Sequence, residues 1–239
     1  MKLPPKWADD SLSDFIQAAF KNALATFVRK PQAFNDLVNI NDIFRKIEGN
    51  LDNAGEDAFI PALFYRSHSA FLTSCRLSVS GQAVETFPLL RSCLEYALYA
   101  LHINKNPSLA EIWLRRHDNE KSRRKIKESF QHRCVMKTLR DIDVALHADL
   151  SQLYEQTIDF GGHPNERGVM GSLAVKAEGD DTAVIRSQFL HGDSRALNHV
   201  LRATTQIGRG SLMVFQLIFK EQFDLLGIHD GIDSLKKVL

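Results

Sequence analysis

The chain has 239 residues, of which 44% are hydrophobic and 25% charged, with a formal net charge of +1. The composition is typical of a globular protein, and the length allows one large domain or two small ones. The small net charge excludes a global attraction to nucleic acid or membranes. Cys75, Cys93 and Cys134 show no CxxC spacing, which argues against a disulfide framework or thiolate zinc site. No apolar run approaches the roughly 18 residues of a membrane helix. We expect a cytoplasmic protein without membrane contact, metal or cofactor.

The first 50 residues predict an N-terminal pair of helices over 10–49. Ser11 follows two aspartates and is the candidate N-cap of the first helix, which Pro31 ends. The pair carries five phenylalanines whose joint exposure would be unfavourable: Phe15, Phe20, Phe27, Phe34 and Phe44. The pair is therefore expected to pack on the rest of the chain or to form the interface of a homodimer.

Two further helices are expected over about 59–80 and 82–104. Pro88 either kinks the second of these or marks its first turn. Ser108 and Glu111 have the spacing of a capping box, and mostly helix, in two or three pieces, is expected from there to the double glycine at 161–162.

The residue pattern is no longer helical after the double glycine. VMGSLAVKAEGDDTAVIRSQF places β-branched residues on both sides of a turn and predicts a β-hairpin over about 172–188. The last long helix is expected to begin near Ser194. The face of this helix that should be buried contains small residues, which suggest close approach of another helix: Thr204, Gly208 and Ser211. The predicted fold is mainly α, a single domain over 1–239 with about seven helices, a core over 59–226, and a hairpin inserted before the last long helix.

The basic residues are concentrated in one segment. Residues 115–140 hold 10 lysines and arginines against 3 acidic residues, so this segment carries +7 and the rest of the chain −6. Its densest part contains Arg123, Arg124, Lys125 and Lys127. Such a concentration is typical of a phosphate-binding surface, although a solvated helix face has the same pattern.

Arg140 and His147 are separated by DIDVAL. On one helix, seven residues are nearly two turns, which would place both side chains on one face. An arginine followed after four to six residues by a histidine resembles the ribonuclease motif of the HEPN superfamily. The resemblance implies that His147 deprotonates a 2′-hydroxyl while Arg140 stabilises phosphorane charge. The alternative is a surface arginine and a half-buried histidine. A second match, Arg186 with His191, falls on the predicted hairpin.

The fourth helix contains RSCLEYALYALH, a polar stripe within an apolar segment. Arg91 and Glu95 are four residues apart and can pair on one face, and Tyr99 and His102 follow at similar steps. This stripe is either a buried polar network that fixes helix register or half of a binding pocket.

The stretch DFGGHPNERG follows a helix. Its two glycines end the helix and Pro164 restricts the next turn, so His163, Asn165 and Arg167 would project from a rigid corner. Such a corner suits binding residues and plain structural turns equally.

LLRSCLEYALYA, followed later by YEQTIDFGGHPN, resembles a group of uncharacterised bacterial all-helical proteins that are loosely HEPN-like. The matching residues are Arg91, Glu95, Tyr154, His163 and Pro164. The resemblance implies a helical bundle, often dimeric, with the His-Pro corner packed near the arginine–glutamate helix. HEPN relatives act in nucleotide binding, RNA cleavage and defence.

Two classes of function remain open. One is a nucleic-acid-directed protein that binds or cleaves RNA, in a defence-type role; the other is a non-catalytic binding or scaffold protein with a pocket for a small ligand or a protein partner.

Four histidines recur at a spacing of 15 residues, but their neighbours share no pattern: His102, His117, His132 and His147. We interpret this spacing as coincidence.

Overall fold

The computed structural model describes residues 4–51, 59–162, 166–177 and 183–228. These residues form eleven α-helices and one antiparallel two-stranded hairpin. The mainly α, single-domain fold with a hairpin before the last long helix is therefore confirmed. The helices outnumber the expected seven mainly because the stretch after residue 107 is divided into several short helices.

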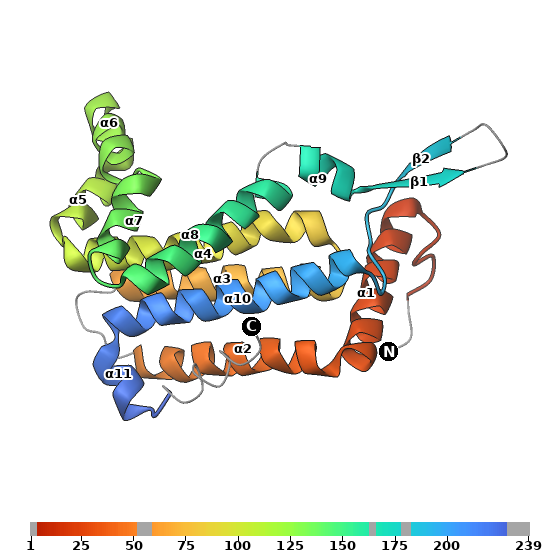
Figure 1. Ribbon diagram of the computed structural model, residues 1–239, viewed down its shortest axis with the longest axis horizontal. Helices are drawn as coiled ribbons and strands as arrows, with labels where there is room; N and C mark the ends of the chain where they lie inside the picture. Colours follow the sequence, from red (N-terminus) through yellow and green to blue (C-terminus); the bar gives the residue numbers. More distant parts are fainter. Residues whose placement is uncertain (1–3, 52–58, 163–165, 178–182, 229–239) are drawn as a thin grey trace.

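Four long helices lie side by side along the long axis of the molecule (Figure 1). They are α2 (Pro31–Leu51), α3 (Phe59–Val79), α4 (Ala83–Lys105) and α10 (Arg195–Ile218). A fifth helix, α8 (Val144–Thr157), packs against α4 and α10. The centre of this bundle is filled by large side chains that are fully buried, among them Phe44, Phe64, Phe71, Leu94 and Phe215.

The two helices of the predicted N-terminal pair have different surroundings. Helix α2 belongs to the bundle, and its Phe44 is fully buried. Helix α1 (Ser11–Arg29) crosses one end of the bundle and leaves Phe20 and Phe27 exposed (Figure 1).

Two predicted helix starts are wrong in detail. Helix α1 is capped by Asp10, whose carboxylate accepts hydrogen bonds from two backbone N–H groups, and not by Ser11. The predicted capping box of Ser108 and Glu111 does not form, because Ser108 is already the first helical residue of α5 (Ser108–Leu114). Glu111 instead forms an ion pair with Arg115, 3.0 Å away.

Helix α4 runs through Pro88, so this proline lies inside the helix and not at its start.

A group of short helices stands at the end of the bundle opposite α1 (Figure 1). It comprises α5, a 3₁₀ turn (Arg115–His117), α6 (Glu120–Ser129) and α7 (His132–Arg140). Asn119 caps α6, and Asp143 caps α8 by accepting a hydrogen bond of 2.9 Å from the Leu146 N–H. These caps help to divide the segment, predicted as mostly helix in two or three pieces, into a larger number of short helices.

The elements between α8 and α10 lie near the α1 end (Figure 1). A π-helical turn (Ile158–Gly162) follows α8, and α9 (Glu166–Gly171) leads into β1 (Leu173–Ala177) and β2 (Ala183–Ser187). The strands pair with Leu173 opposite Ser187, and the hairpin projects from the bundle (Figure 1). Helix α11 (Lys220–Leu225) follows α10. None of the helices in the described ranges combines the length and hydropathy needed to span a membrane.

Close approach between α10 and α3 occurs where the sequence predicted it. Thr204 and Ser211 are fully buried, and a Cβ atom placed on Gly208 would overlap the Phe71 ring and lie 3.0 Å from Cγ2 of Ile40. A side chain at this position must therefore displace a rigid part of the core.

We expect Gly208→Ala to lower the free energy of unfolding by about 1–3 kcal/mol, because the overlap with Phe71 outweighs the better helix propensity of alanine. Gly49 in α2 is the matched control, since a Cβ there meets no atom within 4 Å. Gly49→Ala should raise the free energy of unfolding by about 0.5 kcal/mol. Urea unfolding of both variants measures the difference, and equal stabilities would contradict the close packing at Gly208.

Candidate functional site

A hydrogen-bonded network links α4 to α8. The Arg91 Nε donates to Glu95 Oε1 at 2.8 Å, as their four-residue spacing predicted. The Tyr154 hydroxyl donates to the same oxygen at 2.9 Å, and the Arg91 guanidinium lies 5.1 Å from the centre of the Tyr154 ring. Burial and the Glu95 carboxylate raise the pKa of Tyr154, so its hydroxyl stays a donor.

His132 extends this network toward the surface. Its ring stacks on Tyr154 with centroids 3.8 Å apart and an interplanar angle of 19°. Desolvation lowers the pKa of His132, and the charges on Arg91 and His147 act in the same direction against those on Glu155 and Glu95. The imidazole is thus neutral at pH 7, and its orientation is fixed by a tyrosine that is itself held by Glu95.

A cavity of about 640 Å³ opens beside His132, between α7 and α8. Its lining combines two histidines with three cations and one carboxylate: His132, His147, Arg133, Lys137, Arg140 and Glu155. In the described part of the chain, no carboxylate lies within ion-pair distance of the three cations. The cavity therefore presents net positive charge, three cations against one carboxylate, next to two imidazoles.

Arg140 and His147 do not lie on one helix, contrary to prediction. Helix α7 ends at Arg140 and α8 begins at Val144, because Asp143 caps the new helix. Both side chains nevertheless line the same cavity, brought together by the turn between the two helices. His132 was not among the predicted site residues, since its 15-residue distance from His147 was interpreted as coincidence.

Tyr99 and His102, the other two residues of the predicted polar stripe on α4, contact neighbouring parts of the protein. The Tyr99 ring lies 5.1 Å from that of Phe130. His102 is buried, and its Nε2 donates to the Ser129 carbonyl at 3.1 Å while its Nδ1 accepts from the Thr138 hydroxyl at 2.7 Å. Because both ring nitrogens are used, His102 joins α4 to the end of α6 and to α7 and has no nitrogen left for a ligand.

The corner after α8 is described only in part. His163, Pro164 and Asn165 lie outside the described residues. Gly161 lies so close to α4 that a Cβ atom there would overlap the Val84 carbonyl oxygen. Arg167 is exposed, pairs with Asp159 at 2.7 Å and lies 5.7 Å from the centre of the Phe160 ring. The turn into the corner is thus packed on α4, whereas Arg167 is engaged at the surface.

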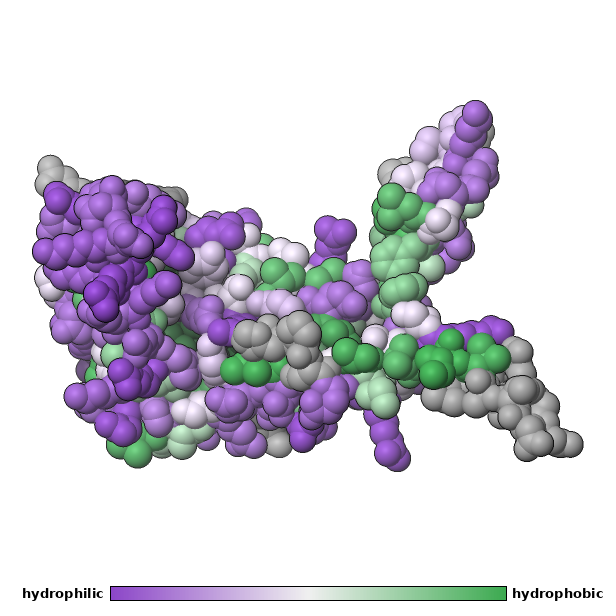
Figure 2. Space-filling view, turned by 90° about the horizontal axis from the view of Figure 1, so that it is seen from above, coloured by the Kyte–Doolittle hydropathy of each residue, from purple (hydrophilic) through white to green (hydrophobic). Residues whose placement is uncertain are grey.

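The four predicted phosphate-binding residues, Arg123, Arg124, Lys125 and Lys127, are exposed on α6. Three of them line one hollow together with Arg116 and Lys121, whereas Lys125 faces another hollow beside α5. Arg124 pairs loosely with Glu128, at 3.6 Å. The end of the molecule that carries these helices is almost entirely hydrophilic (Figure 2). The charges therefore gather on a protruding end, although they do not all face one way.

Arg186, from the second match to the arginine–histidine motif, lies on β2, as expected, away from this end.

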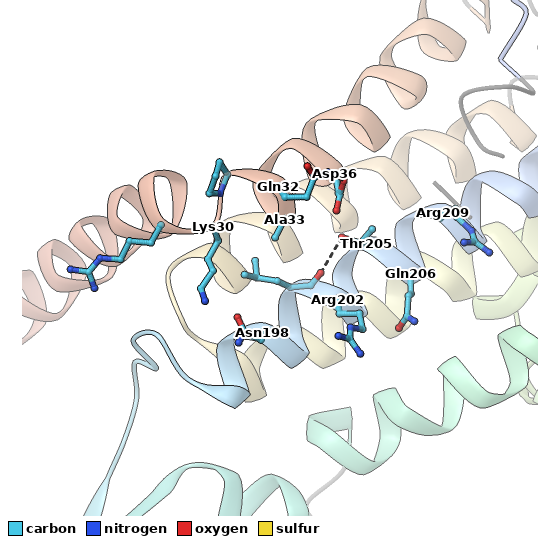
Figure 3. A pocket seen from close by; sticks show the side chains of 12 residues that line it. Lys30, Gln32, Ala33, Asp36, Asn198, Arg202, Thr205, Gln206 and Arg209 are labelled. Carbon is cyan, nitrogen blue, oxygen red and sulfur yellow. Dashed lines mark hydrogen bonds between the residues drawn. The ribbon is translucent and has the colours of Figure 1, made fainter. Parts of the chain in front are cut away.

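A second cavity, of about 490 Å³, lies between the start of α2 and α10 (Figure 3). Its lining includes Lys30, Asp36 and Arg202. Lys30 forms an ion pair with Asp193 at 2.6 Å, and Asp36 accepts a hydrogen bond of 2.9 Å from Gln32. The dashed line in Figure 3 joins the Thr205 hydroxyl to a carbonyl oxygen of its own helix. Several of its polar groups thus already have protein partners, unlike the cations between α7 and α8.

Neither a metal site nor a relative points to an activity. Among the described residues, no three His, Cys, Asp or Glu side chains gather closely enough to hold a metal ion. No family model matches the chain, and neither the curated proteins nor the solved structures gave a match. What the site can do must be inferred from its own geometry.

Proposed function

We propose that this protein is a cytoplasmic, HEPN-like RNA-directed protein that holds a phosphodiester in the cavity between α7 and α8. The observation that carries the proposal is the lining of this cavity, which sets Arg133, Lys137 and Arg140 beside two histidines. A phosphodiester needs cations that are not already neutralised, and arginine and lysine are the side chains that recognise phosphate oxygens. The three free cysteines fit a reducing compartment.

The surrounding surface favours a long polyanion over a small phosphate. The exposed cations of α6 continue the positive charge beyond the cavity, at the same end of the molecule. A strand that occupies the cavity can therefore place neighbouring phosphates along α6. The sequence contains few aromatic residues in this segment, so we expect binding to phosphates with little base preference.

The lining of the same cavity supports a proposal of RNA cleavage. His132, neutral at pH 7, would take the proton from a 2′-hydroxyl, and the resulting oxygen would attack phosphorus. The P–O5′ bond would then break, and His147 would act as the general acid that donates a proton to the departing 5′-oxygen. Arg140 and Lys137 would stabilise the phosphorane charge. The products are a 2′,3′-cyclic phosphate and a 5′-hydroxyl, and the step needs no cofactor.

The test is fluorescence anisotropy of a labelled 12-nucleotide RNA strand at several salt concentrations. We expect log K to fall linearly with log salt, with a slope of about −0.7 for each phosphate contact and therefore at least about −2 for the three cavity cations. Absence of binding at 50 mM salt, or binding that does not depend on salt, would contradict the proposal. Binding without cleavage would favour the alternative class, a non-catalytic binding or scaffold protein.

A further inference from the structure

Helix α1 carries an apolar stripe on its outer side. Its members are Leu12, Ile16, Phe20, Leu24, Phe27 and Val28, and each is between 45 and 73% exposed. Five of the six are spaced by four residues, and this spacing forms one continuous ridge along a helix. The end of the molecule that carries α1 and the hairpin also shows most of the apolar surface in Figure 2. We call these six residues the α1 stripe.

Helix α1 is attached to the bundle by polar contacts and by small side chains, of which Ala23 packs against the core. The Thr26 hydroxyl donates to the Val79 carbonyl at 2.8 Å, and the Asn22 amide donates to the Ser80 carbonyl at 3.2 Å. Thr26 is buried, whereas the apolar side chains of the α1 stripe face solvent. A helix that packs on its own core normally has the reverse arrangement. This inversion indicates that the stripe is covered by another molecule.

The area of the stripe matches one side of a stable interface. Its six side chains expose on the order of 700 Å² together, if a fully exposed large apolar side chain presents about 200 Å². The largest apolar patch of a typical monomer is about 300–600 Å². Each partner in a stable protein–protein interface buries about 800 Å². Phe189, exposed and in contact with Phe15, extends the apolar surface beyond the helix.

The charges of α1 favour a second α1 in antiparallel orientation. Asp9, Asp10 and Asp14 lie at its N-terminal end, whereas Lys21 and Arg29 lie toward its C-terminal end. Antiparallel packing sets the acidic end of one helix against the basic end of the other and opposes the helix dipoles. A membrane surface fits less well, because interfacial helices are rich in lysine and arginine on the polar face.

We propose that a second copy of this chain covers the α1 stripe, in a two-fold symmetric dimer whose axis passes near Phe20. The ridge is symmetric about this residue, so Ile16 of one copy meets Leu24 of the other and Leu12 meets Val28. Ridges of this spacing pack into each other's grooves at an angle near −50°.

Sedimentation at about 50 μM tests the proposal, because a dimer has about twice the 27.0 kDa mass of the chain. Phe20→Glu should raise the dimer dissociation constant at least 100-fold, whereas Leu114→Glu, an exposed apolar residue at the opposite end, should leave it unchanged. Circular dichroism checks that both variants fold. Phe20→Cys should form an interchain disulfide under mild oxidation, and Leu114→Cys should not.

Three outcomes would overturn this proposal. They are a monomeric wild-type protein at 50 μM, a dimer that Phe20→Glu does not weaken, and a Phe20→Cys variant that fails to cross-link. Sedimentation with neutral and anionic vesicles tests the alternative that the α1 stripe binds a lipid surface. Vesicle binding by a protein that stays monomeric would assign the α1 stripe to a lipid surface instead.

Discussion

Replacing His132 with alanine should lower the rate of RNA cleavage by about 100-fold to 10,000-fold, the range expected for loss of a general acid or base. His147→Ala should have a similar effect, because the two histidines line one cavity and supply the two proton transfers. The rate is measured by gel analysis of a labelled strand, with the 2′,3′-cyclic phosphate end as the diagnostic product.

Two control variants separate chemistry from folding. His132→Phe keeps a ring that can stack on Tyr154 but has no proton to transfer, so it should fold normally and still lose cleavage. His117→Ala changes an exposed histidine of the same basic end that does not line the cavity, and it should retain full activity. Cleavage that survives in both His132→Phe and His147→Ala would refute the proposed chemistry, even if RNA is bound.

Neutralising the three cavity cations should weaken RNA binding by about 100-fold at 0.1 M salt, because each single-strand phosphate contact contributes about 0.7 to the salt slope. The variant carries Arg133→Gln, Lys137→Gln and Arg140→Gln together. The slope of log K against log salt should become shallower by about 2. All three side chains are exposed, so the substitutions should leave the fold intact.

The matched control removes three exposed cations from α2 and α3: Arg45, Lys46 and Arg76. Both variants change the net charge by the same amount, so a difference between them reports position and not total charge. We expect the control to reduce affinity less than 10-fold. Equal losses in the two variants would show that binding is diffuse and that the cavity has no special part in it.

The features that were predicted correctly depend on residues that lie close together in the sequence. The pair of Arg91 and Glu95 follows from a four-residue step on one helix, and the small residues around Gly208 indicated close helix packing. The hairpin followed from β-branched residues on both sides of a turn. Each of these features depends on residues a few positions apart, which is the range in which periodicity is informative.

The candidate site depends on contacts that sequence spacing does not encode. His132 and Tyr154 meet because the turn after α7 folds α8 back alongside it, and only a resemblance brought Tyr154 to attention. The break between Arg140 and His147 did leave a signal, since Asp143 directly precedes an apolar helical segment and is a good N-cap. Periodicity marks the apolar face of α1 without showing whether it points inward, so the sequence left packing on the chain and a homodimer interface both open.

The most direct measurement is an NMR titration of the histidine side chains with a short 2′-deoxy strand, which binds but cannot be cleaved. His→Asn variants assign the signals, and the pH is held constant. We predict that the His132 and His147 resonances move together with one dissociation constant, while the buried His68 and His102 stay unchanged. Signals of His132 and His147 that do not respond at saturating strand would contradict a phosphodiester site between α7 and α8.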